Sequence, residues 1–130
     1  MNSLRPTKTR FPYSYSQCES KLTDFKTGRH YRSKNIAANT LLEAMPGGDF
    51  KLWLYHTDVL TIHDEGYYTL NYGDWPSNTT FDRLSAFCPL PVVREGNKWF
   101  VWTTDAGGHM VPFKNGMVVH ESGKIVHYPN

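Results

Sequence analysis

The stretch that decides the fold runs from Phe50 to Phe87 and reads FKLWLYHTDVLTIHDEGYYTLNYGDWPSNTTFDRLSAF. Three segments in it are rich in aromatic and β-branched side chains, which favour half-buried strands: Phe50–Tyr55, Val59–His63 and Tyr67–Tyr72. The connections between these segments are too short for a crossover between parallel strands. The stretch therefore predicts three neighbouring antiparallel strands.

Two short turns set the register of these strands. We expect the first hairpin to turn at His56-Thr57, which would place Leu54 opposite Val59. We expect the second to turn at Asp64–Gly66, because glycine readily adopts the positive φ angle of a bulged loop.

The end of the stretch predicts one short helix near residues 79–88. Trp75-Pro76 ends the sheet pairing, since proline has no N–H to donate. Ser77 and the two residues after it are typical N-cap residues. Phe81 and Leu84 recur at helical spacing, so we expect this helix to pack on one face of the sheet.

Short strands separated by glycine-bearing turns continue to the end of the chain. They are expected at Leu90–Arg94, Lys98–Thr103, Met110–Phe113, Met117–His120 and Lys124–His127. Asn115-Gly116 carries the strongest hairpin signal. The fold class that follows is mainly β (α+β), with one domain over residues 36–130. We expect an antiparallel meander, arranged as a small rolled sheet or barrel.

Charge is distributed unevenly along the 130 residues. The chain has 14 Lys and Arg against 12 Asp and Glu, a formal charge of +2. Residues 1–34 hold eight of the basic side chains but only two of the acidic ones, so their formal charge is +6 and that of the remainder is −4. This asymmetry predicts a basic, extended N-terminal arm over residues 1–35 on an acidic body.

Aromatic side chains are interleaved with the basic ones in this arm, and three interpretations follow. The arm packs its aromatic rings on the body, presents a surface to nucleic acid or an acidic partner, or is disordered. Phosphates attract Lys and Arg, and bases stack on aromatic rings. We expect a partner-binding surface, because so much positive charge is costly to gather without an anionic counterpart. The candidate residues are Arg5, Lys8, Arg10, Tyr13, Tyr15, Lys26, Arg29, Tyr31, Arg32 and Lys34.

The start of the predicted helix is a second candidate site. Free N–H groups at a helix N-terminus, together with Thr79, Thr80 and Arg83, could hold the phosphate of a nucleotide-like ligand. The alternative is an ordinary helix cap with Arg83 in solvent.

Sequence motifs of catalysis and metal binding are missing. His56 and His63 are seven residues apart, as are His120 and His127, whereas a metal site needs three or four converging ligands. The chain has no nucleophile elbow, phosphate loop or HExxH motif. We therefore expect no enzyme, no catalytic residue, no metal and no cofactor.

Cysteine usage and hydropathy favour an intracellular protein. Cys18 and Cys88 lack CxxC spacing, and reduced thiols are expected. No apolar run approaches the roughly 18 residues that cross a bilayer, and the N-terminus has no apolar core of a signal peptide. We expect no membrane partner.

Several short motifs recur in one group of proteins. They are Asn39-Thr40-Leu41, His56-Thr57-Asp58-Val59, Asp64-Glu65-Gly66, the helix start Thr79-Thr80 with Asp82-Arg83-Leu84, Lys98-Trp99-Phe100-Val101 and Val111-Pro112-Phe113. With these motifs, about residues 35–125 resemble small β-rich proteins encoded by tailed phages and related mobile elements. The basic arm lies outside the resemblance. The resemblance implies where the protein originates rather than how it acts. Small phage accessory proteins often act by binding a host factor.

Together these features predict a non-catalytic phage-type accessory protein in the host cytoplasm. Its expected partner is a host macromolecule. This partner is either nucleic acid or a host protein or nucleoprotein complex that handles nucleic acid or serves defence. By binding a defence complex, the protein would act as a counter-defence inhibitor. One alternative is a sponge for a nucleotide-like ligand at the helix N-terminus. Another is a virion or structural component, which would assemble as a symmetric oligomer through exposed strand edges.

Overall fold

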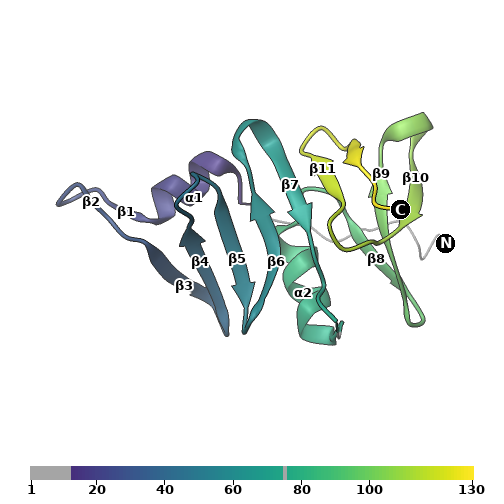
Figure 1. Cartoon of the computed structure of the whole chain (residues 1–130), viewed down its shortest axis with the longest axis horizontal. Coiled ribbons are helices and arrows are strands. Elements are labelled where there is room, and N and C mark those ends of the chain that lie inside the picture. Colours follow the sequence, from purple (N-terminus) through teal and green to yellow (C-terminus); the bar gives the residue numbers. More distant parts are fainter. Residues whose placement is uncertain (1–12, 75) are drawn as a thin grey trace.

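The computed structural model describes residues 13–74 and 76–130, shown in Figure 1. These residues form three antiparallel sheets and two α-helices, α1 (Tyr15–Lys21) and α2 (Asn78–Phe87). The mainly β (α+β) prediction is confirmed, and α2 lies within one residue of the predicted helix. The described residues form no closed barrel, and α1 is a second helix that the sequence patterns did not predict.

The largest sheet has seven strands in the order β12-β11-β7-β6-β5-β4-β3. Its strands are β3 (Ser33–Ala37), β4 (Thr40–Ala44), β5 (Phe50–Leu54), β6 (Thr57–Ile62), β7 (Tyr67–Leu70), β11 (Val118–His120) and β12 (Ile125–His127). From β3 to β7 each strand pairs with the next along the chain, and the β5–β6–β7 part is the predicted meander. β11 then pairs with β7 after the chain has passed through α2 and a second sheet.

Two smaller sheets lie at opposite ends of the long axis of the molecule (Figure 1). The three-stranded sheet contains β8 (Val92–Glu95), β9 (Lys98–Thr103) and β10 (His109–Pro112). The two-stranded hairpin contains β1 (Thr23–Asp24) and β2 (Arg29–His30), and it projects beyond β3 and β4.

The β5–β6 hairpin turns one residue earlier than predicted. Leu54 pairs with Thr57, not with Val59, and Tyr55 begins the turn with a φ of 55°. A bulge leaves Val59 without a partner on β5, so Val59 and Leu60 are adjacent and both fully buried. Such a bulge shifts the register locally and re-aims a side chain, which strict alternation of inward and outward residues does not foresee.

The predicted hairpin at Asn115-Gly116 is also wrong, because these residues connect β10 and β11, which belong to different sheets. A type I′ turn needs a positive φ at both residues; Gly116 has one, at 89°, and Asn115 does not. The Asn115 side chain instead accepts a hydrogen bond from the Tyr72 N–H (2.8 Å) and donates one to the Gly73 carbonyl (3.0 Å). Asn115 therefore ties the connection to the segment that follows β7.

The core lies under one face of the seven-stranded sheet. Leu42, Leu52, Leu60 and Leu70 are each at most 1% exposed and come from four neighbouring strands. Leu84 of α2 belongs to the same buried cluster. Because strand side chains alternate between faces, the opposite face of this sheet carries the polar and partly exposed residues.

An aromatic cluster joins α2 to the three-stranded sheet. Trp99 of β9 contacts the rings of Tyr72, Phe81 and Phe113 edge-on, at centroid distances of 5.1, 5.3 and 5.9 Å. Edge-to-face pairs add to the stabilisation from buried area. No helix among the described residues is long and apolar enough to cross a membrane.

Residues 13–16 were expected to be extended, yet Tyr15 and Ser16 begin helix α1. Ser14 is its N-cap: its hydroxyl accepts from the Gln17 N–H, and the Gln17 side chain accepts from the Ser14 N–H. This reciprocal pair is a capping box. The sequence carries this Ser-x-x-Gln signal, but Tyr13 and Tyr15 also alternate with Ser14 and Ser16 as the residues of a strand do, which favours an extended segment.

Replacing a core leucine should cost far more stability than replacing its outward-facing neighbour. We expect Leu60→Ala to lower the free energy of unfolding by about 2–5 kcal/mol, because it opens a cavity in a fully buried site. Thr61→Ala, on the half-exposed face of the same strand, should cost less than about 1 kcal/mol. Urea unfolding followed by tryptophan fluorescence measures both, and equal losses would contradict the assignment of the faces.

Thiol reactivity should report whether α1 stays docked. Cys18 and Cys88 are both fully buried thiols, and burial, with a smaller effect of Glu19, raises the pKa of Cys18 to about 12. At pH 8 we expect neither thiol to react rapidly with a disulfide reagent in the folded protein, and both to react after denaturation. Cys88→Ser isolates Cys18. Rapid reaction of Cys18 in this folded variant would mean that α1 detaches from the sheet.

Candidate partner-binding surface

From residue 13 onward, the basic segment is a folded part of the molecule. Cys18 and Leu22 are 0% and 3% exposed and belong to the main core. The Tyr15 ring contacts Phe50 edge-on at 4.9 Å, and its hydroxyl donates to the Gly48 carbonyl at 2.7 Å. Helix α1 is thus fixed to the sheet at its start, middle and end.

The β1–β2 hairpin follows α1 directly and is held by local hydrogen bonds. The Gly28 N–H donates to the Asp24 carbonyl at 2.7 Å, and the Lys26 N–H donates to the Asp24 carboxylate at 3.0 Å. Gly28 has a φ of 72°, which glycine adopts without strain. At the base of the hairpin, the Tyr31 N–H donates to the Leu22 carbonyl at 2.7 Å. The hairpin is therefore a defined structure rather than a free tail.

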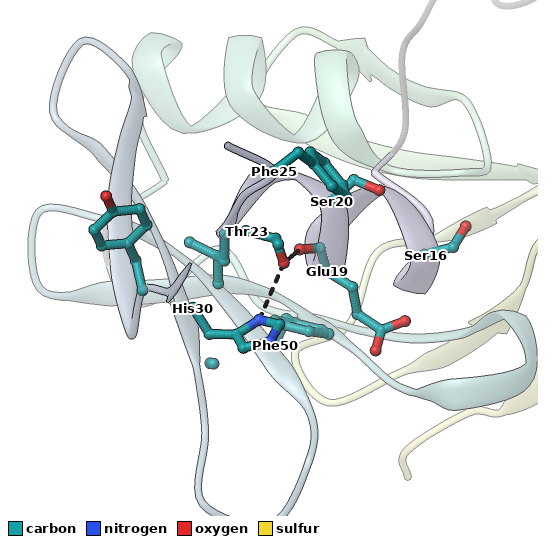
Figure 2. Close-up of a pocket in the computed structure, with 10 residues that line it drawn as sticks. Ser16, Glu19, Ser20, Thr23, Phe25, His30 and Phe50 are labelled. Atoms are coloured by element: carbon teal, nitrogen blue, oxygen red, sulfur yellow. Dashed lines mark hydrogen bonds between the residues drawn. The ribbon is translucent and has the colours of Figure 1, made fainter. Parts of the chain in front are cut away.

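A pocket of about 500 Å³ lies between α1 and the β1–β2 hairpin (Figure 2). We call it the helix–hairpin pocket. Leu22, Ala44 and Phe50 contribute its apolar lining. Its polar lining comes from Ser16, Glu19, Ser20, Thr23 and His30, and its aromatic lining is completed by Phe25 and Tyr31.

Hydrogen bonds hold the polar residues of this pocket in place. The Thr23 hydroxyl donates to the Glu19 carbonyl at 2.7 Å and lies 3.1 Å from His30 Nδ1 (Figure 2). A hydroxyl has one proton to donate. Because the Thr23 hydroxyl donates its proton to the hydrogen bond with the Glu19 carbonyl, the Thr23 oxygen accepts from His30 Nδ1–H. This hydrogen bond sets the orientation of the imidazole ring.

Two aromatic rings of the pocket are exposed to solvent. Phe25, in the hairpin turn, is 78% exposed, and Tyr31, just after β2, is 43% exposed. Phe25 follows Asp24 in a turn whose backbone is held by hydrogen bonds, so the position of its Cα is fixed. Exposed rings beside a pocket are typical of binding surfaces.

Exposed basic side chains come from the same segment of the chain as these rings. Lys21, Lys26, Arg29, Arg32 and Lys34 are all exposed, whereas the same segment contributes only Glu19 and Asp24 as acidic residues. Within residues 13–74 and 76–130, Arg32 is the only member of this group in an ion pair, with its Nε 3.7 Å from Glu43 and its side chain 74% exposed. An ion pair so open to water contributes little, and the positive charge of the group remains available. These five residues, with Phe25 and Tyr31, form the basic hairpin surface.

The sequence-predicted arm residues divide into three sets. Lys26, Arg29, Tyr31, Arg32 and Lys34 are all exposed and belong to the basic hairpin surface. Tyr13 and Tyr15 are half-buried and pack on Phe87 and Phe50. Arg5, Lys8 and Arg10 lie outside the described residues.

Sequence reasoning missed Lys21, Phe25 and His30 as members of the site. The turn signal Asp24-Phe25-Lys26-Thr27-Gly28 would have located the exposed ring, because aspartate and glycine at these places favour a tight loop. No comparable signal predicts the pocket, since Ala44 and Phe50 reach it from the large sheet.

A comparison with protein families matches residues 19–120 to the Kyanoviridae Gp96 protein family. The chain belongs to this family. It is therefore a small phage-encoded protein, as the sequence resemblance implied. The match begins inside α1 and so includes the hairpin, which the resemblance over residues 35–125 had left out. No curated protein and no solved structure matched the chain.

In this Gp96-family protein, the second candidate site is built into the fold. Arg83 Nε donates to the Thr40 hydroxyl at 2.7 Å, and Nη2 donates to the Ala38 carbonyl at 3.0 Å. The Ser77 hydroxyl accepts from the Thr80 N–H, and Thr80 is 6% exposed. Thr79 is half-buried. These contacts favour a helix cap and a tie between α2 and the β3–β4 turn.

The histidines belong to separate polar networks. His63 Nδ1 lies 3.1 Å from the Asp49 carboxylate and its Nε2 lies 2.7 Å from the Thr69 hydroxyl. Pairing of Phe50 with Ile62 brings Asp49 and His63 together across the hairpin. The carboxylate–imidazole–hydroxyl order is that of an acid–base relay, but all three groups differ from those lining the helix–hairpin pocket. That the protein is not an enzyme stays a prediction.

Metal ligands do not converge in the part of the chain that the structure describes, where no group of three His, Cys, Asp or Glu side chains could hold an ion. His56 is exposed near the tip of the β5–β6 hairpin. His120 Nε2–H donates to the Glu65 carbonyl at 3.0 Å, and His120 Nδ1 accepts from the Ser122 N–H at 3.1 Å and lies 2.9 Å from the Ser122 hydroxyl.

Removing the Arg83 tie should destabilise the fold. We expect Arg83→Ala to lower the free energy of unfolding by about 1.5–3 kcal/mol, because it removes hydrogen bonds from a charged donor, one of them to the buried Thr40. Lys98→Ala, an exposed cation on β9, is the control and should change it by less than about 0.5 kcal/mol. Unchanged stability in Arg83→Ala, measured by urea unfolding, would instead leave Arg83 available for a ligand.

Proposed function

We propose that this phage protein is a non-catalytic accessory protein that binds a host macromolecule through the basic hairpin surface. Nucleic acid is the partner whose chemistry fits this surface best. Binding to a host complex that handles nucleic acid or serves defence, with a counter-defence role in the host cytoplasm, is the wider form of the same proposal.

One observation carries the proposal. Residues 19–34 present five exposed basic side chains and two exposed aromatic rings against two acidic side chains, and of the five only Arg32 is in an ion pair among the described residues. A charge cluster of this kind has an electrostatic cost in the free protein, which an anionic partner relieves. Lysine and arginine neutralise phosphates, and a protein that does so releases condensed counterions.

The geometry also supports a fixed binding surface. A disordered basic tail would lose conformational freedom on binding, whereas the hairpin turn is already held by hydrogen bonds to Asp24 and Thr27. Less ordering is therefore required when a partner binds.

Charge reversal on the hairpin should weaken nucleic-acid binding and its dependence on salt. In the double variant Lys26→Glu with Arg29→Glu, we expect log K for nucleic-acid binding to fall less steeply with log salt concentration. The magnitude of this slope should decrease by about two, one for each lost phosphate contact. The measurement is fluorescence anisotropy of a labelled oligonucleotide titrated with the full chain between low and physiological salt.

The matched control changes the net charge equally at the other end of the molecule. Lys98→Glu with Lys124→Glu places the same reversal on exposed sites away from the hairpin, and binding should be nearly unchanged. Equal weakening by both double variants would show attraction to net charge alone. Binding that is insensitive to salt would contradict the proposal.

A further inference from the structure

The basic hairpin surface has a feature that phosphate binding leaves unexplained. Phe25 has no hydrogen-bonding group in its side chain, yet it is 78% exposed in the turn between β1 and β2. Tyr31 lies on the same hairpin unit and is 43% exposed. Lysine and arginine would bind phosphates equally well without either ring.

We propose, resting on the function proposed above, that the ligand is single-stranded nucleic acid and that one unpaired base enters the helix–hairpin pocket beside Phe25 and Tyr31. In a duplex the faces of the bases are stacked on one another. An aromatic side chain gains stacking energy only from a base whose face is free. Two exposed rings among basic residues therefore fit a single strand better than a duplex.

The pocket has the dimensions and lining that a base requires. Its volume of about 500 Å³ lies within the range of about 300–1,000 Å³ found for small-molecule sites. Leu22, Ala44 and Phe50 offer apolar contact to the flat face of a heterocycle. Polar groups of Glu19, Thr23 and His30 also line it and can meet the edge of the base.

The charges around the pocket determine on which side the sugar–phosphate backbone of the strand lies. Glu19 lines the pocket on the α1 side and repels phosphate, while its carboxylate can accept from an amino or imino group of a base. Lys26 and Arg29 lie on the hairpin side and attract phosphate. The sugar–phosphate backbone accordingly passes over the hairpin, and the base points from it into the pocket.

The pocket needs little rearrangement to receive a base. The Thr23 hydroxyl is hydrogen-bonded to both the Glu19 carbonyl and His30 Nδ1. Phe50, which lines the pocket, is fixed by the Tyr15 ring at 4.9 Å. Preorganised sites lose less entropy on binding.

The test compares two exposed aromatic residues of the pocket with one elsewhere. Phe25→Ala and Tyr31→Ala should each weaken binding of a single-stranded 16-mer about 5- to 150-fold, the loss expected for one stacked base. The salt slope should not change, because no phosphate contact is lost. Tyr55→Asn is the control: Tyr55 is 65% exposed on another hairpin, and asparagine tolerates its φ of 55°. Circular dichroism confirms that each variant is folded.

The probes are fluorescein-labelled single strands of DNA and of RNA with one sequence, the matching DNA duplex, and a strand carrying 2-aminopurine. Either single strand should bind at least tenfold more tightly than the duplex. The fluorescence of 2-aminopurine should be quenched by the wild-type protein and not by Phe25→Ala. Comparison of the DNA and RNA arms tells which sugar is preferred.

The outcomes separate this inference from the proposed function. Two results would overturn the stacked base and leave phosphate binding intact. The first is equal affinity for the duplex and the single strand. The second is normal binding by Phe25→Ala and Tyr31→Ala when the double variant Lys26→Glu with Arg29→Glu is impaired. Competition by polyglutamate as effective as that by a single strand would assign the pocket to an acidic polypeptide. Failure of every oligonucleotide to bind would overturn both proposals.

Discussion

Burial of one side of α1 against the large sheet is the constraint on which the rest of this surface depends. Cys18 and Leu22 enter the core, and Tyr15 spans from Phe50 to the Gly48 carbonyl. The helix has only seven residues, and an isolated helix of that length is unstable in water. Tertiary packing therefore holds α1 in place, and α1 in turn sets where the β1–β2 hairpin leaves the body.

In the N-terminal segment, residues that stabilise the fold and residues that are free to bind a partner lie only a few positions apart. Its apolar side chains stabilise the fold, and its basic side chains remain in solvent. Removing residues 1–34 as a block would take Cys18 and Leu22 out of the core, so such a deletion cannot distinguish loss of binding from loss of folding. Single exposed residues of the hairpin can, because none of the five basic side chains is buried.

The two ends of the molecule have different characters. At one end, Trp99, Phe81, Tyr72 and Phe113 bury one another between α2 and the small sheet. At the other, Phe25 and Tyr31 have comparable rings but remain open to water. Aromatic side chains bury large areas when they pack, so rings left exposed next to a pocket and basic residues are more informative than the aromatic content of the chain. Membership of a phage protein family states the origin of the chain; the proposed function comes from this local chemistry.

Local rules were enough to predict much of the fold from sequence. Short connections and glycine turns correctly predicted the β5–β6–β7 meander, the turn at Asp64–Gly66 and the bounds of β9, because these depend on neighbours in the chain. Two features depended on distant partners and were not predicted. One is the bulge at Val59, which places two adjacent residues in the core, and the other is the role of Asn115, whose side chain bonds to Tyr72 and Gly73 after β7. Charge counting also located the basic segment and most of its exposed residues. The sequence could not show that Tyr13 and Tyr15 are consumed by packing, or that Ala44 and Phe50 complete a pocket with Phe25 and Tyr31. Composition and local spacing determine which chemistry a segment can offer, whereas only the tertiary contacts decide which of its side chains remain free to offer it.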